Sequence, residues 1–498
     1  MKRPPSRGLV LAIIGFGVFI AADDLTVVST MLRQIIFDLE IPLPEGLDQA
    51  AWIVNAYLIA YVVVMPFIGR LSDLLGRRLV FISALVLFLA GSVWVPIAAD
   101  LESNRLAWFI VGRVLTALGG GAMVPVGMAV IGDLYPKERR ATALGALGAI
   151  DTAGWVWGPL YGAMLVRFLD WRWQFYLNIP LSLAGIAAAW WALRDLPTPI
   201  QKGRIDWLGT GLLTVGLLAL NIALLQSGDV GSAGGFGQVS EVETGSAWPL
   251  YALAGLALAL FVLIERRHKD PLIDLSLFRR ANFTPAVLVN FLVGCVLIIA
   301  MVDVPLFINI RVVDVQQAAI DSGLLLSALT AAMAVMAYVG GRWTEAKGYR
   351  QVTMLGVIAI IAGFLLVGRT WTEMPGYVVM GLQLAVLGVG FGLVTAPVGA
   401  AVINAAPDDQ RGIAASLVIV LRLMGMSVGL SGLTALGLYR FDVLRGQLEL
   451  PPLGDPGFAA AVAEGLQTTT MQVLAESFLV CALIGVAALV ASAMLRDR

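Results

Sequence analysis

Long runs of apolar residues alternate with short polar segments along the whole chain. Each run holds roughly 20 residues, which is enough for a helix to cross a hydrocarbon core about 30 Å thick. We therefore predict an all-α polytopic membrane protein with fourteen spans. The spans are expected near residues 8–37, 50–68, 79–98, 107–132, 141–166, 173–193, 207–227, 248–265, 283–310, 320–340, 351–368, 377–404, 413–438 and 470–494.

Composition supports this prediction. The 498 residues are 59% hydrophobic and only 13% charged, whereas an ordinary soluble protein carries about 25% charged residues. Cys295 and Cys481 both fall inside apolar runs, so no disulfide framework is expected. His268 is the only histidine and lies in the charged run 265–270, which excludes a His-rich metal site. Neither a metal, nor a cofactor, nor a nucleic-acid partner is expected.

Basic residues are distributed unevenly among the polar segments that connect the predicted spans. Most of the 33 Lys and Arg residues fall on the side that carries both chain ends, which predicts that both termini are cytoplasmic. An odd number of spans would place Arg496 and Arg498 on the opposite side, so the charge pattern favours fourteen spans over thirteen. Residues 228–247 are rich in Gly and Ser and are predicted to form a flexible outer loop.

Two charged clusters have the same spacing. The first holds Gly69 and Gly76 around Asp73, and its basic residues are Arg70, Arg77 and Arg78. The second, residues 341–350, again has two glycines seven apart, with Glu345 four residues after the first glycine. We expect each cluster to be a turn that needs the permissive backbone of glycine.

These clusters fall between the second and third spans of two sets of six. The predicted domains are a six-helix bundle over residues 1–194, an inserted helix pair over 195–282 and a second six-helix bundle over 283–498. An internal repeat of this kind is typical of alternating-access transporters.

Ionisable residues inside spans are energetically expensive and therefore indicate function. Asp23 and Asp24 lie midway along span 1, where desolvation and mutual repulsion favour the neutral form of at least one carboxyl. Such a carboxyl can take up and release a proton as water access changes sides. Because neighbouring helix residues point about 100° apart, one is expected to face the pathway, and we select Asp24. Arg113 in span 4 is expected to tune these acids. The alternatives are a permanent ion pair with one acid and snorkelling of Arg113 to the interface.

Three further charges lie within spans. Asp151 and Arg422 are each about ten residues into spans 5 and 13, so their depths match. This predicts an ion pair between the two halves, and the alternative is two separate charges. Asp303, near the outer end of span 9, is either a pathway or gate acid or an interfacial acid without a role.

Small residues are concentrated in span 5. They allow helices to approach closely, and proline bends a helix by freeing a backbone carbonyl. This composition fits both plain packing and a mechanistic role. The residues are Gly154, Gly158, Pro159 and Gly162.

Catalytic signatures are missing from the sequence. No Gly-rich phosphate loop followed by Lys-Ser/Thr is present, which argues against ATP hydrolysis. A serine-hydrolase or metalloprotease constellation would need a histidine, and His268 lies in a polar charge run. We therefore expect a transporter rather than an enzyme.

Several motifs resemble those of one family. The segment from Gly69 to Arg78 resembles the loop 2–3 signature of the major facilitator superfamily, and residues 24–28, Asp-Leu-Thr-Val-Val, resemble the span-1 motif of its fourteen-span drug:proton antiporters. Gly112-Arg113 with Gly119 and Gly121 resembles the span-4 motif of proton-coupled members. It departs from that motif at Thr116 and Ala117. The small residues of span 5 resemble the antiporter motif. The resemblance implies that Asp73 faces the start of span 13 and forms a cytoplasmic latch.

Short segments also resemble the mycobacterial lipid exporters of this family that work with a periplasmic lipoprotein. They are Asp24 with Thr30-Met31, 158–162, 302–304, 422–426 and 437–441. The resemblance implies a proton-coupled, monomeric exporter of triacylglyceride-like lipids or other amphipaths in the bacterial cytoplasmic membrane. It leaves open a lipoprotein partner. The alternatives are a multidrug:proton antiporter and a proton-independent lipid flippase or facilitator.

Overall fold

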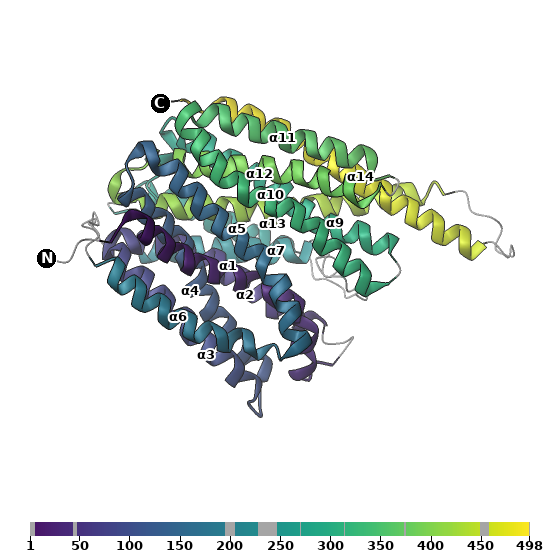
Figure 1. Cartoon of the computed structure of the whole chain (residues 1–498), viewed down its shortest axis with the longest axis horizontal. Helices are drawn as coiled ribbons and strands as arrows, with labels where there is room; N and C mark the ends of the chain where they lie inside the picture. Colours follow the sequence, from purple (N-terminus) through teal and green to yellow (C-terminus); the bar gives the residue numbers. More distant parts are fainter. Residues whose placement is uncertain are drawn as a thin grey trace.

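The computed structural model describes residues 5–42, 47–194, 205–227, 247–268, 270–312, 314–372, 375–448 and 458–497. These residues form long helices joined by short connections (Figure 1). The first six are α1 (Arg7–Asp38), α2 (Leu47–Leu75), α3 (Arg77–Ala99), α4 (Arg105–Leu134), α5 (Lys137–Phe168) and α6 (Arg172–Ala192). Two more follow, α7 (Trp207–Ser227) and α8 (Trp248–Glu265). The remaining elements are η2 (Leu275–Arg279), α9 (Phe283–Arg311), α10 (Val315–Lys347), α11 (Tyr349–Thr370), α12 (Tyr377–Ala405), η3 (Asp408–Gln410), α13 (Arg411–Arg445) and α14 (Phe458–Ala493).

The helices form two bundles. In the N-terminal bundle, α3 packs on α4 and α6, and α1 packs on α5. In the C-terminal bundle, α11 and α14 pack outside α12 and α9. The bundles meet where α2 packs on α13 and where α5 packs on α10. The two contacts are equivalent to each other, because each joins the second helix of one half to the fifth helix of the other, as an internal repeat requires.

The inserted helices α7 and α8 pack on each other, and α7 also contacts α2 and α13. The predicted outer loop at 228–247 lies almost entirely outside the described residues. The first predicted domain boundary also falls at the edge of an undescribed stretch, 195–204, so the domain limits stay a prediction.

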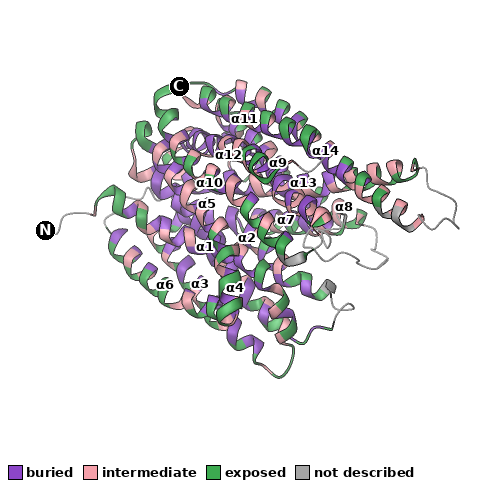
Figure 2. Ribbon diagram, turned by 45° about the vertical axis from the view of Figure 1, so that its right-hand side comes forward, coloured by how far each residue is buried: buried purple, intermediate pink, exposed green. Residues whose placement is uncertain are grey.

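Within the part of the chain that the structure describes, thirteen helices are long and apolar enough to cross a membrane. The exception is α5, which is 32 residues long but carries charged residues at its start and end, and Asp151 within it. Exposed residues gather on the outward faces of the bundles and buried residues lie between helices (Figure 2). The chain is thus a multi-pass membrane protein.

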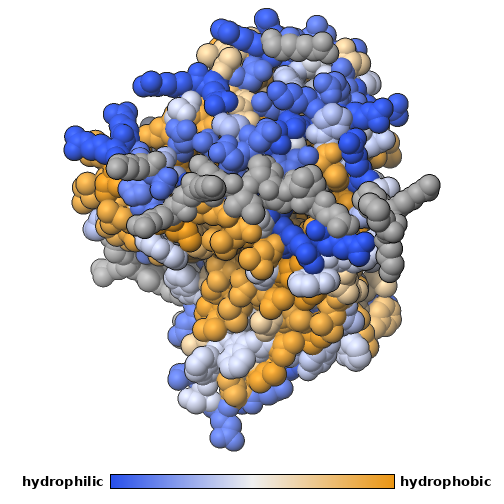
Figure 3. All heavy atoms as spheres, turned by 90° about the vertical axis from the view of Figure 1, so that its left-hand side faces the viewer, coloured by the Kyte–Doolittle hydropathy of each residue, from blue (hydrophilic) through white to orange (hydrophobic). Residues whose placement is uncertain are grey.

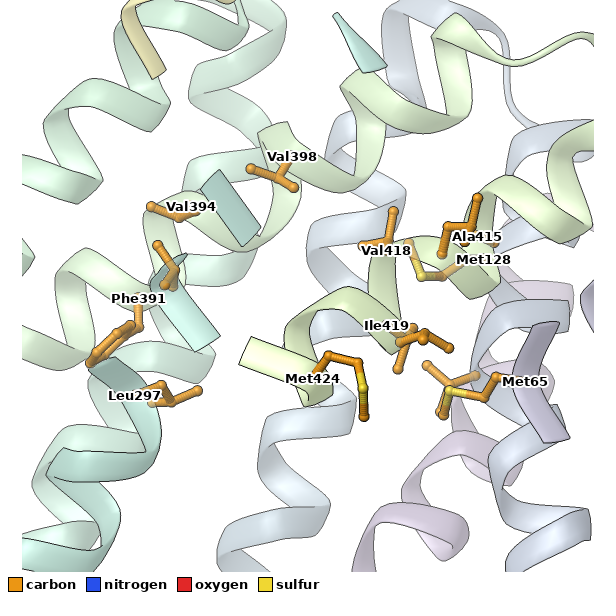
Figure 4. Close-up of a cluster of buried hydrophobic side chains, with 14 of the residues drawn as sticks. Met65, Met128, Leu297, Phe391, Val394, Val398, Ala415, Val418, Ile419 and Met424 are labelled. Carbon is orange, nitrogen blue, oxygen red and sulfur yellow. The ribbon is translucent and has the colours of Figure 1, made fainter. Parts of the chain in front are cut away.

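Apolar side chains join the two bundles at their centre. Met65 of α2 and Met128 of α4 lie in the same buried cluster as Val418 and Ile419 of α13 (Figure 4). Phe391 of α12 belongs to this cluster as well. The halves therefore share one packed core in this conformation.

Both charged clusters are more helical than predicted. The helix α2 continues through Gly69 to Leu75, and only Gly76, with φ +94°, breaks the chain. Similarly, α10 continues to Lys347 and breaks at Gly348, with φ +90°. The expected turn at Gly69 is wrong for a packing reason. A Cβ there would lie 2.6 Å from the carbonyl oxygen of Gly412, so this glycine serves close helix approach.

Both chain ends lie at the same end of the molecule (Figure 1), which we call the terminal face. It carries the ends of α2, α4, α10 and α12 and the starts of α1, α3, α5 and α11. Figure 3 looks onto this face and shows hydrophilic side chains over its upper part, with apolar side chains on the flanks below. The last helix also begins earlier than span 14 was predicted to begin, which extends it away from this face.

Candidate functional site

The centre of the N-terminal bundle contains a buried ion pair. Arg113 Nη1 of α4 donates to Asp24 Oδ2 of α1 at 2.8 Å, and Arg113 Nη2 approaches the Asp24 carbonyl at 3.4 Å. Asp24 is 0% exposed and Arg113 is 1% exposed. The other oxygen of Asp24 accepts a hydrogen bond from Asn178 Nδ2 of α6 at 3.3 Å. Arg113 therefore points into the bundle and does not snorkel to an interface.

Asp23 lies beside this pair with fewer partners. Its Oδ2 accepts from Gln174 Nε2 of α6 at 3.1 Å, and its Oδ1 is buried without a hydrogen-bond partner among the described residues. An orphaned buried oxygen on a carboxyl is destabilising unless the group binds a proton or another donor. Asp23 is thus the less satisfied acid, whereas Asp24 is enclosed by partners.

Several residues of this site were not predicted from the sequence. The guanidinium of Arg113 lies over the Tyr57 ring of α2, 4.2 Å from its centroid, in a cation–π contact. Gln174 and Asn178 were detectable as polar amides inside an apolar run. Tyr57 was not, because nothing in a span sequence says which aromatic ring meets a guanidinium.

The small residues of α5 pack directly against the helix that bears the acids. A Cβ on Gly154 would lie 3.2 Å from the Asp23 amide nitrogen, and one on Gly158 would lie 2.9 Å from the Asp23 carbonyl oxygen. Gly162 makes the same kind of approach to Val27. The antiporter-like motif, which also contains Pro159, therefore sets the distance between α5 and the segment of α1 that holds the carboxyls.

Replacing Gly158 with Ala is expected to destabilise the protein by about 2 kcal/mol, because the added methyl overpacks a backbone contact. Thermal unfolding of the purified protein measures this loss. The matched control is Gly381→Ala on α12, where a Cβ would meet nothing within 4 Å. Equal melting temperatures for the two variants would contradict the assignment.

The predicted pair between the two halves is present as a contact. Arg422 Nη2 of α13 lies 3.6 Å from Asp151 Oδ2 of α5. The pair borders a small cavity between the bundles that is lined mostly by apolar side chains, among them Trp155, Leu297 and Met333. Asp151 Oδ1 has no hydrogen-bond partner among the described residues, so the pair is only partly satisfied in this conformation.

Asp303 lies on α9, eight residues before the helix ends at Arg311. It is half-buried. The structure does not bring it together with Asp23, Asp24 or Arg113. Its assignment as a pathway or gate acid stays a prediction.

On the terminal face, Asp73 of α2 caps the start of α13. Its two carboxylate oxygens accept from the backbone N–H groups of Gly412 at 2.9 Å and Ile413 at 3.0 Å. A carboxylate at a helix N-terminus satisfies unpaired amides and the helix dipole. The contact expected for Asp73 is therefore present, and it joins the N-terminal bundle to the C-terminal one.

A chain of charges extends this contact. Arg77 Nη1 lies 2.5 Å from Asp73 Oδ1, and Arg77 Nε donates to Asp133 Oδ2 at 3.0 Å. Asp133, at the end of α4, also accepts from Arg411 Nη1 of α13 at 2.9 Å. Asp133 and Arg411 were not selected from the sequence, although both are charges at the edge of a span.

The second cluster also joins the two bundles through a carboxylate and a backbone amide, but its amide lies inside α5 and not at a helix start. Glu345 of α10 accepts from the backbone N–H of Thr142 of α5 at 3.0 Å. A Cβ on Gly341 would clash with the carbonyl of Ala141, as the first glycine of the other cluster does with α13. Glu345 is exposed and has one amide partner, so it holds less strongly than Asp73.

Arg78 lies apart from these contacts. Its guanidinium covers the ring of Trp190 on α6 at 4.3 Å. It therefore acts within the N-terminal bundle.

Buried charge pairs inside an all-helical membrane protein, with carboxylate-to-amide contacts between two bundles, are typical of a transporter of the repeat type. The family model of the Major Facilitator Superfamily matches residues 14–430, and the chain belongs to that family. It is therefore a transporter rather than an enzyme.

Curated relatives are similar over almost the whole chain. The triacylglyceride transporter of Mycolicibacterium hassiacum is 31% identical over 485 residues, which cover 94% of this chain and 88% of that protein. The triacylglyceride transporter of Mycobacterium tuberculosis is 31% identical over 507 residues, with 99% and 95% covered. The multidrug transporter protein MdtP of Bacillus subtilis is 30% identical over 485 residues, with 95% and 84% covered.

Solved structures share the fold. The human organic anion transporter MFSD10 superposes with a TM-score of 0.61 at 15% identity, covering 97% of this chain and 100% of that one. The proton:xylose symporter XylE superposes with a TM-score of 0.62 at 13% identity, covering 96% and 94%. The predicted family is thus confirmed by sequence and by fold.

Proposed function

We propose that this protein is a proton-coupled, alternating-access exporter. The observation that supports the coupling is the buried group of Asp23, Asp24 and Arg113 in the N-terminal bundle. Two carboxyls and one guanidinium carry one negative charge too many for a dry site. Binding of one proton removes the excess, so this group is suited to alternate between two protonation states.

In the proposed cycle, a proton from outside binds Asp24. Asp24 then no longer balances the charge of Arg113, and the adjacent carboxylate of Asp23 takes over that role. The change shifts α1 against the glycine face of α5, and α5 contacts α10 of the other half. Rocking of the two halves then couples the inward movement of the proton to the outward release of the substrate.

The contacts of Asp73 and Glu345 are proposed to be the closed state of a gate on the terminal face. In the proposed orientation this face lies in the cytoplasm, and the protein lies in the bacterial cytoplasmic membrane. The helix α5 is proposed to cross the membrane as well, which brings the number of spans to fourteen. Opening the gate exposes the substrate site to the cytoplasm and requires α2 to leave α13. The Asp151–Arg422 contact is proposed to bias the same equilibrium from within the membrane.

Lipids of the triacylglyceride type are the proposed substrates, since several relatives carry that name. The similarity to a multidrug transporter supports a second candidate, export of amphipathic drugs. A lipid-handling lipoprotein and the surrounding membrane lipids are the proposed partners, and the transporter is proposed to act as a monomer.

Reconstitution into vesicles with an imposed pH gradient tests the proposal. Fluorescent triacylglyceride and a cationic dye are offered in parallel, with and without an uncoupler. We expect lipid movement that requires the gradient. Dye movement alone would favour the multidrug function, and lipid movement that survives the uncoupler would identify a proton-independent flippase.

A further inference from the structure

The inserted helix pair is fastened to the C-terminal bundle. On α7, Asn221 Oδ1 accepts from Ser427 Oγ at 3.3 Å, and the Leu224 carbonyl accepts from Ser431 Oγ at 2.8 Å. Both serines belong to α13. Toward the N-terminal bundle, α7 borders a cavity of about 470 Å³ whose lining is almost wholly apolar. Its lining includes Trp52, Val63, Phe67, Val114, Leu118 and Trp207.

A second attachment lies at the terminal face. Glu265, the last residue of α8, accepts from the backbone N–H of Leu272 through Oε1 at 3.0 Å. Leu272 begins a segment that belongs to the C-terminal bundle, because Leu277 is fully buried and Arg280 donates to the Ala405 carbonyl at 2.8 Å. Glu265 thus ties the end of α8 to the connection that leads into α9.

A second carboxylate meets Glu265 at this point. Asp206 precedes α7, and its Oδ1 accepts from the backbone N–H of Gly209 at 2.9 Å. Oxygens of both carboxyl groups lie within 2.7 Å of the position that a Cβ on Gly209 would occupy. The two acids therefore face each other across space that only glycine leaves open. Each is 4% exposed.

In the described part of the chain, each of the two carboxyl groups has one oxygen that lacks a hydrogen-bond donor. Asp206 Oδ2 and Glu265 Oε2 are both buried without a hydrogen-bond partner among the described residues. The oxygens that meet beside Gly209 are Asp206 Oδ2 and Glu265 Oε1. Two ionised carboxylates this close repel each other, and a proton between them removes the repulsion and gives the orphan Asp206 Oδ2 a partner. We propose that Asp206 and Glu265 hold one proton between them, and that this proton clasps the start of α7 to the end of α8, whose Glu265 is tied to the segment that leads into the C-terminal bundle.

The charged groups around the pair support a single remaining negative charge. His268 Nδ1 lies 4.0 Å from Asp206 Oδ2, and the His268 side chain is 39% exposed. A positive charge on this ring would stabilise the remaining negative charge. Charged residues of neighbouring segments at this end include Arg70 of α2, Arg411 of α13, Asp270 and Asp274. Arg411 pairs with Asp133, Asp274 accepts from the Ser276 amide, and neither Arg70 nor Asp270 is without a partner.

The clasp gives the protein a dependence on pH with a definite sign. Its stabilisation is fully present at acidic pH, while the proton is bound. As pH rises through neutral the proton leaves, two negative charges oppose each other across Gly209, and the stabilisation is lost. Alkaline conditions at the terminal face therefore release the start of α7 from the end of α8.

Thermal unfolding of the full-length protein in detergent, from pH 6 to pH 9, tests the clasp without a transport assay. The wild type is expected to lose at least about 2 °C of its melting temperature toward pH 9. Glu265→Gln, whose amide oxygen still accepts from Leu272, is expected to lose distinctly less. The matched control is Glu102→Gln, an exposed acid at the other end of the molecule, which should follow the wild type.

Infrared spectroscopy gives the second measurement. The C=O stretching band of a protonated carboxyl at pH 7 is expected to weaken in Glu265→Gln and equally in Asp206→Asn, because each change removes half of one shared site. If Glu265→Gln does not fold, Asp206→Asn carries both measurements. A wild-type melting profile in these variants, together with an unchanged carboxyl band, would overturn the proposal.

Discussion

Replacing Asp24 with Asn is expected to abolish proton-driven transport and to destabilise the N-terminal bundle. The loss of transport follows from the proposed role of the carboxyl as proton acceptor. The destabilisation follows from Arg113, which is 1% exposed and would keep a buried positive charge opposite a neutral amide. Removing one partner of a buried ion pair costs about 3–5 kcal/mol.

Vesicle transport under a pH gradient and thermal unfolding separate the two effects. The double variant Asp24→Asn with Arg113→Gln removes both charges, so we expect it to regain much of the stability but none of the coupled transport. Asp23→Asn should be the milder change in stability, since Asp23 has one amide partner rather than an ion pair. Full transport by a well-folded Asp24→Asn variant would refute the coupling role.

Replacing Asp73 with Asn is expected to open the proposed gate on the terminal face. Asparagine can accept from only one of the two amides at the start of α13, and its NH₂ group would oppose the other. Arg77, which is 0% exposed, would also lose one of its two carboxylates. A loss of about 3 kcal/mol would change the ratio of closed to open molecules roughly a hundredfold.

Electron-resonance distance measurements between spin labels on the two halves of the terminal face report this ratio directly. The matched control is Glu345→Gln at the equivalent position of the other half. Its effect should be several times smaller, because Glu345 is exposed and bonds one amide. Identical distance distributions for Asp73→Asn and the wild type would show that the contact does not hold the gate.

The sequence was sufficient to predict the internal repeat and most of the buried charged residues. Apolar run length predicted fourteen spans, and thirteen of the described helices are long and apolar enough to be spans. The family resemblance implied the contact of Asp73 with the start of α13, which the structure contains. The helix break at Gly76 was also foreseeable from a glycine between two long helices. The matched depths of Asp151 and Arg422 were enough to predict their contact across the two halves.

Other features depend on three-dimensional packing that a span sequence does not encode. Gly69 looks like a turn residue, yet it is helical and lies against Gly412 because two helices must nearly touch there. Helix rotation predicted that one of the two acids faces the pathway, and Asp24 was selected; the structure encloses Asp24 and leaves an oxygen of Asp23 unpaired. The carboxyl pair next to Gly209 joins residues 59 positions apart, which no local pattern reveals.

The helix α5 is the long helix without a strongly apolar stretch, and its packing explains why. Its first half lies against the C-terminal bundle, where a Cβ on Gly145 would meet the carbonyl of Ala337, and its second half lies against α1. A helix that packs on protein along much of its length can carry polar residues there, and the exposed apolar side chains of α5, among them Trp157, Leu160 and Met164, lie in its second half. The same feature has a consequence for biogenesis. During synthesis α1 precedes α5, but α10 does not yet exist, so half of the face that shelters α5 is missing when α5 leaves the ribosome. Its stable placement in the membrane therefore has to wait for the second half of the chain.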